Sequence, residues 1–129
     1  LEECGVSITE YVVIPDENEI IQEKVIQYRK QDIDLIIYTG GTGLSIRDVT
    51  PEALLPLLER RIPGVEEAIR TYGQDRTPYS MLSRSVAGTI GNTLVLALPG
   101  STNGAKESMD AIFPAVLHIF RILKGARHD

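Results

Sequence analysis

A glycine-rich loop supplies residues that could bind a phosphate-bearing ligand. Residues 40–43 read Gly-Gly-Thr-Gly and follow directly on the apolar run "DLIIYT". Glycine lets backbone N–H groups turn toward a ligand and lets a phosphate approach without a Cβ in the way. The loop lacks the Lys-Ser/Thr ending of a Walker motif and the spacing of a dinucleotide fingerprint. Gly40, Gly41, Thr42 and Gly43 are therefore candidates for close ligand approach, with a plain tight turn as the alternative.

Two carboxylates stand near this loop in the expected fold. Asp16 follows Pro15 at the end of an expected strand, and Asp48 comes five residues after the glycine loop. Two carboxylates at the ends of neighbouring strands suit Mg²⁺, which takes one or two protein oxygens and completes its shell with water and phosphate. Each also has a structural alternative, because Asp16 could cap a helix and Asp48 could lie at the favourable end of a helix dipole.

A third stretch, "LPGSTNGAKE", follows an expected strand and opens an expected helix with Gly100, Ser101, Gly104 and Lys106. Free N–H groups and the helix dipole favour anions at a helix N-terminus, and a serine and a lysine could add side-chain donors. The stretch predicts a phosphate seat. The alternative is a serine cap beside a solvated lysine.

The elements that must position these loops begin with a strand, a helix and a strand. Residues 6–14, "VSITEYVVI", are rich in β-branched residues and end at Pro15, which predicts a strand. Asp16 and Glu19 have the spacing of a capping box, and Ile21, Val25 and Tyr28 recur at helical spacing. Residues 34–39 predict a strand buried on both faces of a parallel sheet. The order is that of a βαβ unit.

The remaining pattern completes an α/β fold. Thr50 and Pro51 predict a helix cap and first residue, with the helix over 51–61 and a further helical stretch over 65–74. Residues 81–89 and 93–98 predict a hairpin, and an apolar face predicts a last helix over 104–124, kinked at Pro114. We expect a three-layer α/β/α sandwich with a mostly parallel sheet and an antiparallel hairpin element.

Composition narrows the function classes. The chain has 129 residues, 43% of them hydrophobic, which suits one domain with a real core, and no apolar run has the length of a membrane span. A formal charge of −5 argues against a nucleic-acid surface. One cysteine forms no internal disulfide and fits a reducing compartment, so we expect a cytoplasmic protein. Cys4, His118 and His128 lie away from the three loops and are not expected to be catalysts.

Longer blocks carry a resemblance that covers the whole chain. The blocks "VVIPDENEI", "TGGTGLSIRDVTPEAL", "IPGVEEAIR" and "MLSRSVAGTIGNTLVLALPGS" resemble the MogA/MoaB-type molybdopterin adenylyltransferases, including the G domain of gephyrin. Arg-Asp-Val-Thr-Pro-Glu after Thr-Gly-Gly-Thr-Gly distinguishes this group from the related CinA-like domains. The family has one more strand and a Ser/Asp-Gly loop before the point where residue 1 stands, so residues 1–129 are expected to form one molybdopterin-binding domain without its first strand.

The resemblance implies a function and assigns roles. It implies a trimer that adenylylates the terminal phosphate of molybdopterin with Mg-ATP, releases pyrophosphate and prepares the cofactor for a molybdate-inserting protein. It places nucleotide contacts on residues 40–43, and catalytic, metal-binding roles on Asp16 and Asp48. It places molybdopterin contacts around Ser83, Pro99, Gly100 and Ser101, to which the loop chemistry adds Lys106.

Two other functions stay open at this point. A trimeric scaffold module would bind molybdopterin without turnover, and a CinA-like nucleotide pyrophosphatase would hydrolyse a dinucleotide without any pterin. The acidic pair favours an enzyme over a scaffold, because a scaffold has no use for two carboxylates in a cleft.

Overall fold

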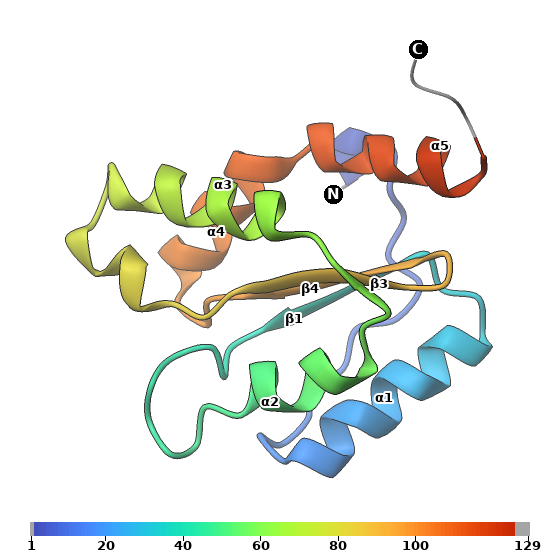
Figure 1. Cartoon of the computed structure of the whole chain (residues 1–129), viewed down its shortest axis with the longest axis horizontal. Helices are drawn as coiled ribbons and strands as arrows, with labels where there is room; N and C mark the ends of the chain where they lie inside the picture. Colours follow the sequence, from blue (N-terminus) through green and yellow to red (C-terminus); the bar gives the residue numbers. More distant parts are fainter. Residues whose placement is uncertain (1, 126–129) are drawn as a thin grey trace.

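The computed structural model describes residues 2–125, whose helices and strands form three layers (Figure 1). Helices α1 (Asn18–Lys30) and α2 (Thr50–Leu54) cover one face of a four-stranded sheet. Helices α3 (Pro63–Gln74), α4 (Thr102–Ile112) and α5 (Ile119–Leu123) cover the other face. The α/β sandwich expected from the sequence is confirmed.

The sheet consists of β1 (Leu35–Thr39), β2 (Arg60–Arg61), β3 (Val86–Ile90) and β4 (Thr93–Leu98), in the order β1-β4-β3-β2. β1 pairs in parallel with β4, whereas β3 is antiparallel to both of its neighbours. The expected hairpin between β3 and β4 is therefore confirmed, but its first strand begins at Val86 rather than at residue 81, which lies in a 3₁₀ turn that ends at Leu82. Within residues 2–125, however, only one of the three pairings is parallel, so the sheet is mixed rather than mostly parallel.

Residues 6–14 account for much of this difference, since the strand predicted there is wrong. The segment joins no sheet, and Tyr11 and Val13 are 85% and 82% exposed. β-Branched residues favour a strand only where the backbone has a partner to pair with and the side chains have a face to bury. Among the described residues no strand pairs with this segment, and of its side chains it is Ile14, at the end, that packs against the core.

Two helix boundaries also differ from the pattern. Helix α1 begins at Asn18 with Glu17 as its N-cap and no side-chain cap bond, so Asp16 is not the cap. Helix α2 ends at Leu54 and passes into a 3₁₀ turn over Leu55–Leu57, far short of the expected residue 61. Pro56 explains the early end, because proline lacks the N–H that a longer helix needs and its ring clashes with the preceding turn.

The apolar C-terminal stretch is broken rather than kinked. Helix α4 ends at Ile112, a 3₁₀ turn covers Ala115–His118, and α5 follows. Phe113 is extended, with φ −94° and ψ 143°, as expected for a residue before proline. The apolar face survives this break, since Met109, Ile112, Phe113, Val116 and Phe120 all pack into the same cluster.

Two apolar clusters hold the sheet in place from its two faces. Ile21 and Val25 of α1 pack with Ile36, Val95 and Ala97 on one face, while Leu94, Leu96 and Leu98 pack against α3 and α4 on the other. Because β4 contributes to both clusters, the parallel pair β1 and β4 lies at the centre of the packing. No helix in residues 2–125 has the length and apolarity needed to cross a membrane.

Tyr38 adds a polar tie between β1 and the helix layer. Its hydroxyl donates a hydrogen bond to the backbone oxygen of Ile21 at 2.9 Å. Burial raises the pKa of Tyr38 well above its usual value near 10, so the phenol stays protonated and keeps its donor. The tie fixes α1 against the strand that leads into the glycine loop.

Candidate functional site

The loops that follow β1 and β4 meet at the carboxyl ends of the two parallel strands. The Gly40 N–H donates to the carbonyl of Leu98 at 2.9 Å. A Cβ placed on Gly100 would lie 3.0 Å from the Cα of Gly40. The two loops therefore pack backbone against backbone, in the position where open α/β sheets bind their ligands.

The glycine loop is closed by Thr50. Gly40 and Gly41 have φ of +101° and +69°, a conformation that side chains disfavour. The Thr50 hydroxyl donates to the carbonyl of Gly40 at 3.0 Å, and its N–H donates to that of Gly41 at 3.1 Å. Val49 rather than Thr50 is the N-cap of α2. Thr50 therefore fixes the shape of the loop instead of capping the helix, which corrects the expectation from the sequence.

Asp48 lies beside this loop. Its Oδ2 accepts hydrogen bonds from the N–H and the hydroxyl of Ser45, at 3.0 and 2.9 Å. A Cβ on Gly43 would come within 2.7 Å of the same oxygen. The carboxylate is half-buried and rests against the loop backbone, and its Oδ1 accepts no hydrogen bond from the described residues. The fold thus brings Asp48 and residues 40–43 together.

Asp16 is placed differently. It lies exposed in the bend before α1, and within residues 2–125 its side chain makes no hydrogen bond or ion pair. No group of three or more His, Cys, Asp or Glu side chains gathers in the described part of the chain. A closed zinc-type site is therefore not formed there. Carboxylate oxygens without imidazole or thiolate are the donors that fit Mg²⁺, which needs only one or two of them.

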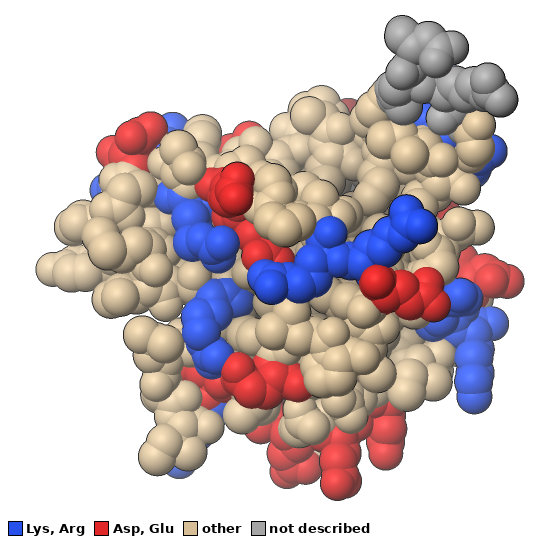
Figure 2. All heavy atoms as spheres, in the orientation of Figure 1, with Lys and Arg blue, Asp and Glu red and all other residues tan. Residues whose placement is uncertain are grey.

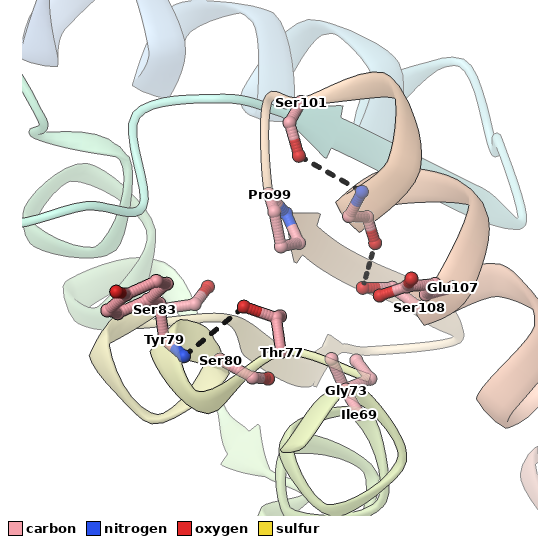
Figure 3. Close-up of a pocket in the computed structure, with 11 residues that line it drawn as sticks. Ile69, Gly73, Thr77, Tyr79, Ser80, Ser83, Pro99, Ser101, Glu107 and Ser108 are labelled. Atoms are coloured by element: carbon pink, nitrogen blue, oxygen red, sulfur yellow. Dashed lines mark hydrogen bonds between the residues drawn. The ribbon is translucent and has the colours of Figure 1, made fainter. Parts of the chain in front are cut away.

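A cavity of about 280 Å³ opens beside the loop after β4 (Figure 3). Pro99 and Ser101 border it from the loop after β4, and Ser83 borders it from the stretch before β3. The structure therefore brings together three of the residues that the resemblance implies for molybdopterin. The remaining lining comes from α3, from the 3₁₀ turn Pro78–Leu82 with its N-cap Thr77, and from α4: Ile69, Gly73, Thr77, Tyr79, Ser80, Gly104, Glu107 and Ser108.

Ser101 is the N-cap of α4. Its Oγ accepts a hydrogen bond from the Gly104 N–H at 3.0 Å, which leaves the hydroxyl proton for another acceptor. Glycine at 104 leaves room for this cap, because a Cβ there would lie 2.6 Å from the same oxygen and 2.9 Å from the Cβ of Pro99. The structure confirms the capping alternative for Ser101. Lys106 is exposed and does not line the cavity, and Gly100 contacts Gly40 instead.

Sequence reasoning missed most of the polar lining. Ser108 is only 3% exposed and donates to the carbonyl of Gly104 at 2.8 Å. Residues four apart on a helix share a face, so the Gly104–Ser108 spacing carried a usable signal. The polar turn over residues 77–80 carried a weaker one. This turn reaches the cavity because it packs closely on α3 at Gly73. A Cβ on Gly73 would lie 2.3 Å from the Ser80 hydroxyl oxygen.

The cavity and the glycine loop are neighbours. The Thr42 hydroxyl lies 3.4 Å from that of Ser83, and the Arg84 N–H donates to the carbonyl of Thr42 at 2.7 Å. A second hollow of about 340 Å³ shares Ser83 with the cavity, and its lining includes Arg61, Arg70 and Arg84 together with Glu52 and Glu66. Figure 2 shows Lys and Arg side chains gathered across the middle of one face, between α2 and α3.

The second hollow has only a small excess of positive charge, because its two glutamates pair with its three arginines. Among the described residues, neither hollow is lined by Cys4 or His118. His128 lies outside the described residues.

Comparison with known proteins identifies the family. Residues 1–118 match the model of the MoCF_biosynth family, whose description reads "Probable molybdopterin binding domain". The chain is 41% identical over 128 residues to the molybdenum cofactor biosynthesis bifunctional protein of Chlorobaculum tepidum, matching 99% of this chain and 41% of that one. It is 40% identical over 116 residues to the molybdenum cofactor biosynthesis protein B of Staphylococcus carnosus, matching 88% and 68%.

Solved structures of related proteins have a similar fold. The crystal structure of the molybdopterin biosynthesis enzyme MoaB from Thermus thermophilus superposes with a TM-score of 0.85 at 41% identity, covering 95% of this chain and 78% of that one. The chain spans less than half the length of the bifunctional relative.

Proposed function

The chain belongs to the MoCF_biosynth family of molybdenum cofactor biosynthesis, and on that premise we propose that it adenylylates molybdopterin with Mg-ATP. In this reaction an oxygen of the terminal phosphate of molybdopterin attacks the α-phosphorus of ATP. A bond forms between them, the bond to the β-phosphate breaks, and pyrophosphate leaves. The product carries AMP on the terminal phosphate.

One observation carries the proposal: two chemically different loops touch at the ends of adjacent parallel strands. The glycine loop offers backbone N–H groups beside the Asp48 carboxylate, and the loop after β4 borders a cavity of molecular size. Because Gly40 and Gly100 are in contact, ligands bound at the two loops would lie side by side. Positioning two substrates in this way is what a phosphoryl-group transfer chiefly requires.

We assign the ligands to the loops as follows. The nucleotide binds along residues 40–43, whose glycines allow close approach of a phosphate. Molybdopterin binds in the cavity, with its phosphate near the N-terminus of α4, Ser83 and Ser101. Lys106 lies on the exposed side of α4 and would act on the phosphate only through long-range charge.

Asp48 and Asp16 are the residues that would hold Mg²⁺. Asp48 fits this role better, because its half-buried carboxylate lies next to the loop and keeps Oδ1 available. Bound there, Mg²⁺ would offset negative charge on the phosphates of ATP. Asp16 lies exposed in the bend before α1, and its role in holding the metal stays a prediction.

The test is formation of adenylylated molybdopterin by purified protein with ATP and Mg²⁺, measured together with pyrophosphate release. Asp48→Asn is the matched variant, because an amide oxygen can still accept the two Ser45 hydrogen bonds. We expect it to melt like the wild type and to lose activity about 100-fold, the scale typical of lost electrostatic stabilisation. Full activity in Asp48→Asn would remove the residue from the proposed mechanism.

Two rival functions are outcomes of the same assay. Molybdopterin binding without product would indicate a scaffold module, and hydrolysis of a dinucleotide without pterin would indicate a CinA-like pyrophosphatase. The proposed assembly is a homotrimer that passes its product to a molybdate-inserting protein. Light scattering should give about three times the chain mass if the closed cyclic assembly forms.

A further inference from the structure

Arg84 donates several hydrogen bonds to the glycine loop and to the residues that follow it. Its Nε donates to the carbonyl of Gly43 at 2.8 Å, and its Nη2 donates to the carbonyl of Asp48 at 2.7 Å. Its Nη1 pairs with the carboxylate of Glu52 in α2. The backbone N–H of the same residue donates to Thr42. One residue therefore contacts both limbs of the loop and the helix that follows it.

The contacts use the shape of the guanidinium group. Its donors are fixed in one plane, so three acceptors can be held at once only if they keep a fixed relation to each other. The acceptors here belong to residues 43, 48 and 52, which flank the exposed turn 44–47. A lysine ammonium also has three donors, but they sit on one nitrogen at the end of a flexible stem and cannot reproduce the planar spacing of the three guanidinium nitrogens.

Charge pairing alone does not explain the arrangement. The Glu52 side chain is 53% exposed, and ion pairs between exposed groups contribute little to stability. Arg61 and Arg70, in contrast, both contact Glu66, a carboxylate only 3% exposed that also accepts the Ala87 N–H at 3.1 Å. Those two arginines neutralise a buried charge, whereas Arg84 mainly binds backbone carbonyls of the loop.

We propose that Arg84 is a positioning residue: its guanidinium holds Gly43 and Asp48 at a fixed separation and so sets the loop that receives the nucleotide. The role in nucleotide binding rests on the proposed function, but the hold on the loop does not. Arg84 also follows Ser83, which borders the cavity. It thus connects the loop to the second ligand site without lining that cavity.

The first test reads the loop directly and needs no ligand. Hydrogen exchange at the bonded amides of Ser45, Asp48 and Thr50 should speed up about tenfold in Arg84→Gln, which corresponds to about 1.4 kcal/mol of lost loop stability. In Arg84→Lys these amides should exchange nearly as fast as in Arg84→Gln, because lysine keeps the charge but lacks the planar arrangement of donors. Glu52→Gln keeps both carbonyl contacts and should stay within about twofold of the wild type. Arg60→Gln, an exposed arginine of β2, is the control for the loss of one charge.

The outcomes decide the role. Restoration of slow exchange by lysine would show that charge alone matters and would overturn the proposal, as would unchanged exchange in Arg84→Gln. If Arg84→Gln fails to fold, Arg84→Lys carries the test by itself. A melting curve for each variant separates loosening of the loop from global unfolding.

The second test links the loop to the reaction. Both Arg84 variants should lower kcat about tenfold or more and raise the KM for Mg-ATP, while the KM for molybdopterin changes less than about twofold. Equal changes in both KM values would mean that Arg84 supports the whole domain rather than the nucleotide loop. A wild-type protein that neither binds Mg-ATP nor forms product would refute the proposed function, and the exchange measurement would still decide whether Arg84 holds the loop.

Discussion

The two loops of the candidate site follow adjacent strands but differ in how they are stabilised and in what they present to a ligand. The loop after β1 is held by hydrogen bonds from Ser45 and Thr50 of the same segment and from Arg84 of the stretch before β3, and its carbonyls are largely used in holding its shape. The loop after β4 is short, ends at the Ser101 cap and borders a cavity made by side chains from other elements. One loop presents backbone, and the other helps to enclose space.

This difference shows how two ligands can be kept apart within one small domain. A backbone surface with glycines suits phosphates, which need N–H groups more than shape. A cavity with a few polar groups suits a ring system, which buries area and needs orientation. Changes in one loop should therefore affect one ligand more than the other.

The largest effect is expected for Gly41→Ala. A Cβ there would lie 2.1 Å from the Thr50 hydroxyl, and φ of +69° would strain the alanine. The free loop of this variant should relax to relieve backbone strain of about 1–3 kcal/mol. Returning it to the binding conformation then costs that amount, so affinity for Mg-ATP should fall by about 10- to 100-fold in calorimetry.

Gly64→Ala is the matched control for that change, because a Cβ at Gly64 meets nothing within 4 Å. It should bind both ligands as the wild type does. If Gly41→Ala weakens molybdopterin and ATP by the same factor, the two loops are not separate sites.

A smaller loss of affinity, for the other ligand, is expected for Ser101→Leu. Leucine cannot accept the Gly104 N–H, and its side chain would crowd the mouth of the cavity. Molybdopterin affinity should drop roughly tenfold, for a loss of about 1–2 kcal/mol, while ATP affinity barely moves. Ser101→Gly leaves the helix N-terminus open and costs a cap only a few tenths of a kcal/mol, so it should retain most of the affinity. Near-normal molybdopterin binding by the leucine variant would exclude the proposed phosphate seat.

The smallest effect on ligands is expected for Tyr38→Phe, which removes the tie between β1 and α1 below both loops. Unfolding free energy should fall by about 1 kcal/mol, with both ligand affinities unchanged. Denaturant unfolding of the two proteins, with the same ligand titrations, measures both quantities.

The same residue gives a pH dependence. The pKa of Tyr38 is raised in the folded state, so the unfolded chain loses that proton first as pH rises past about 10, and stability should fall from there upward. Tyr38→Phe should make that alkaline loss shallower. Identical alkaline melting profiles for the two proteins would contradict the assignment.

Local pattern predicted most of the elements correctly. The hairpin over β3 and β4, the helix at α1 and the buried strand at β1 follow from turn residues and apolar periodicity, which act over a few neighbouring residues. The misses have two causes. The segment 6–14 and the helix expected through Pro114 satisfied local preferences, but a strand needs a pairing partner and a helix needs the N–H that proline lacks.

What the sequence by itself determined is the identity of the loops: glycines at 40, 41 and 43, Asp48 beyond them, and a serine cap at 101, together with the family that these blocks resemble. The tertiary structure alone decided their relation, namely the contact of Gly40 with Gly100, the hold of Arg84 on Gly43 and Asp48, and the cavity lined by Ser80 and Ser108. These contacts join residues that lie far apart in the sequence. Such pairings depend on strand order and on how helices pack across the sheet, which local spacing does not encode.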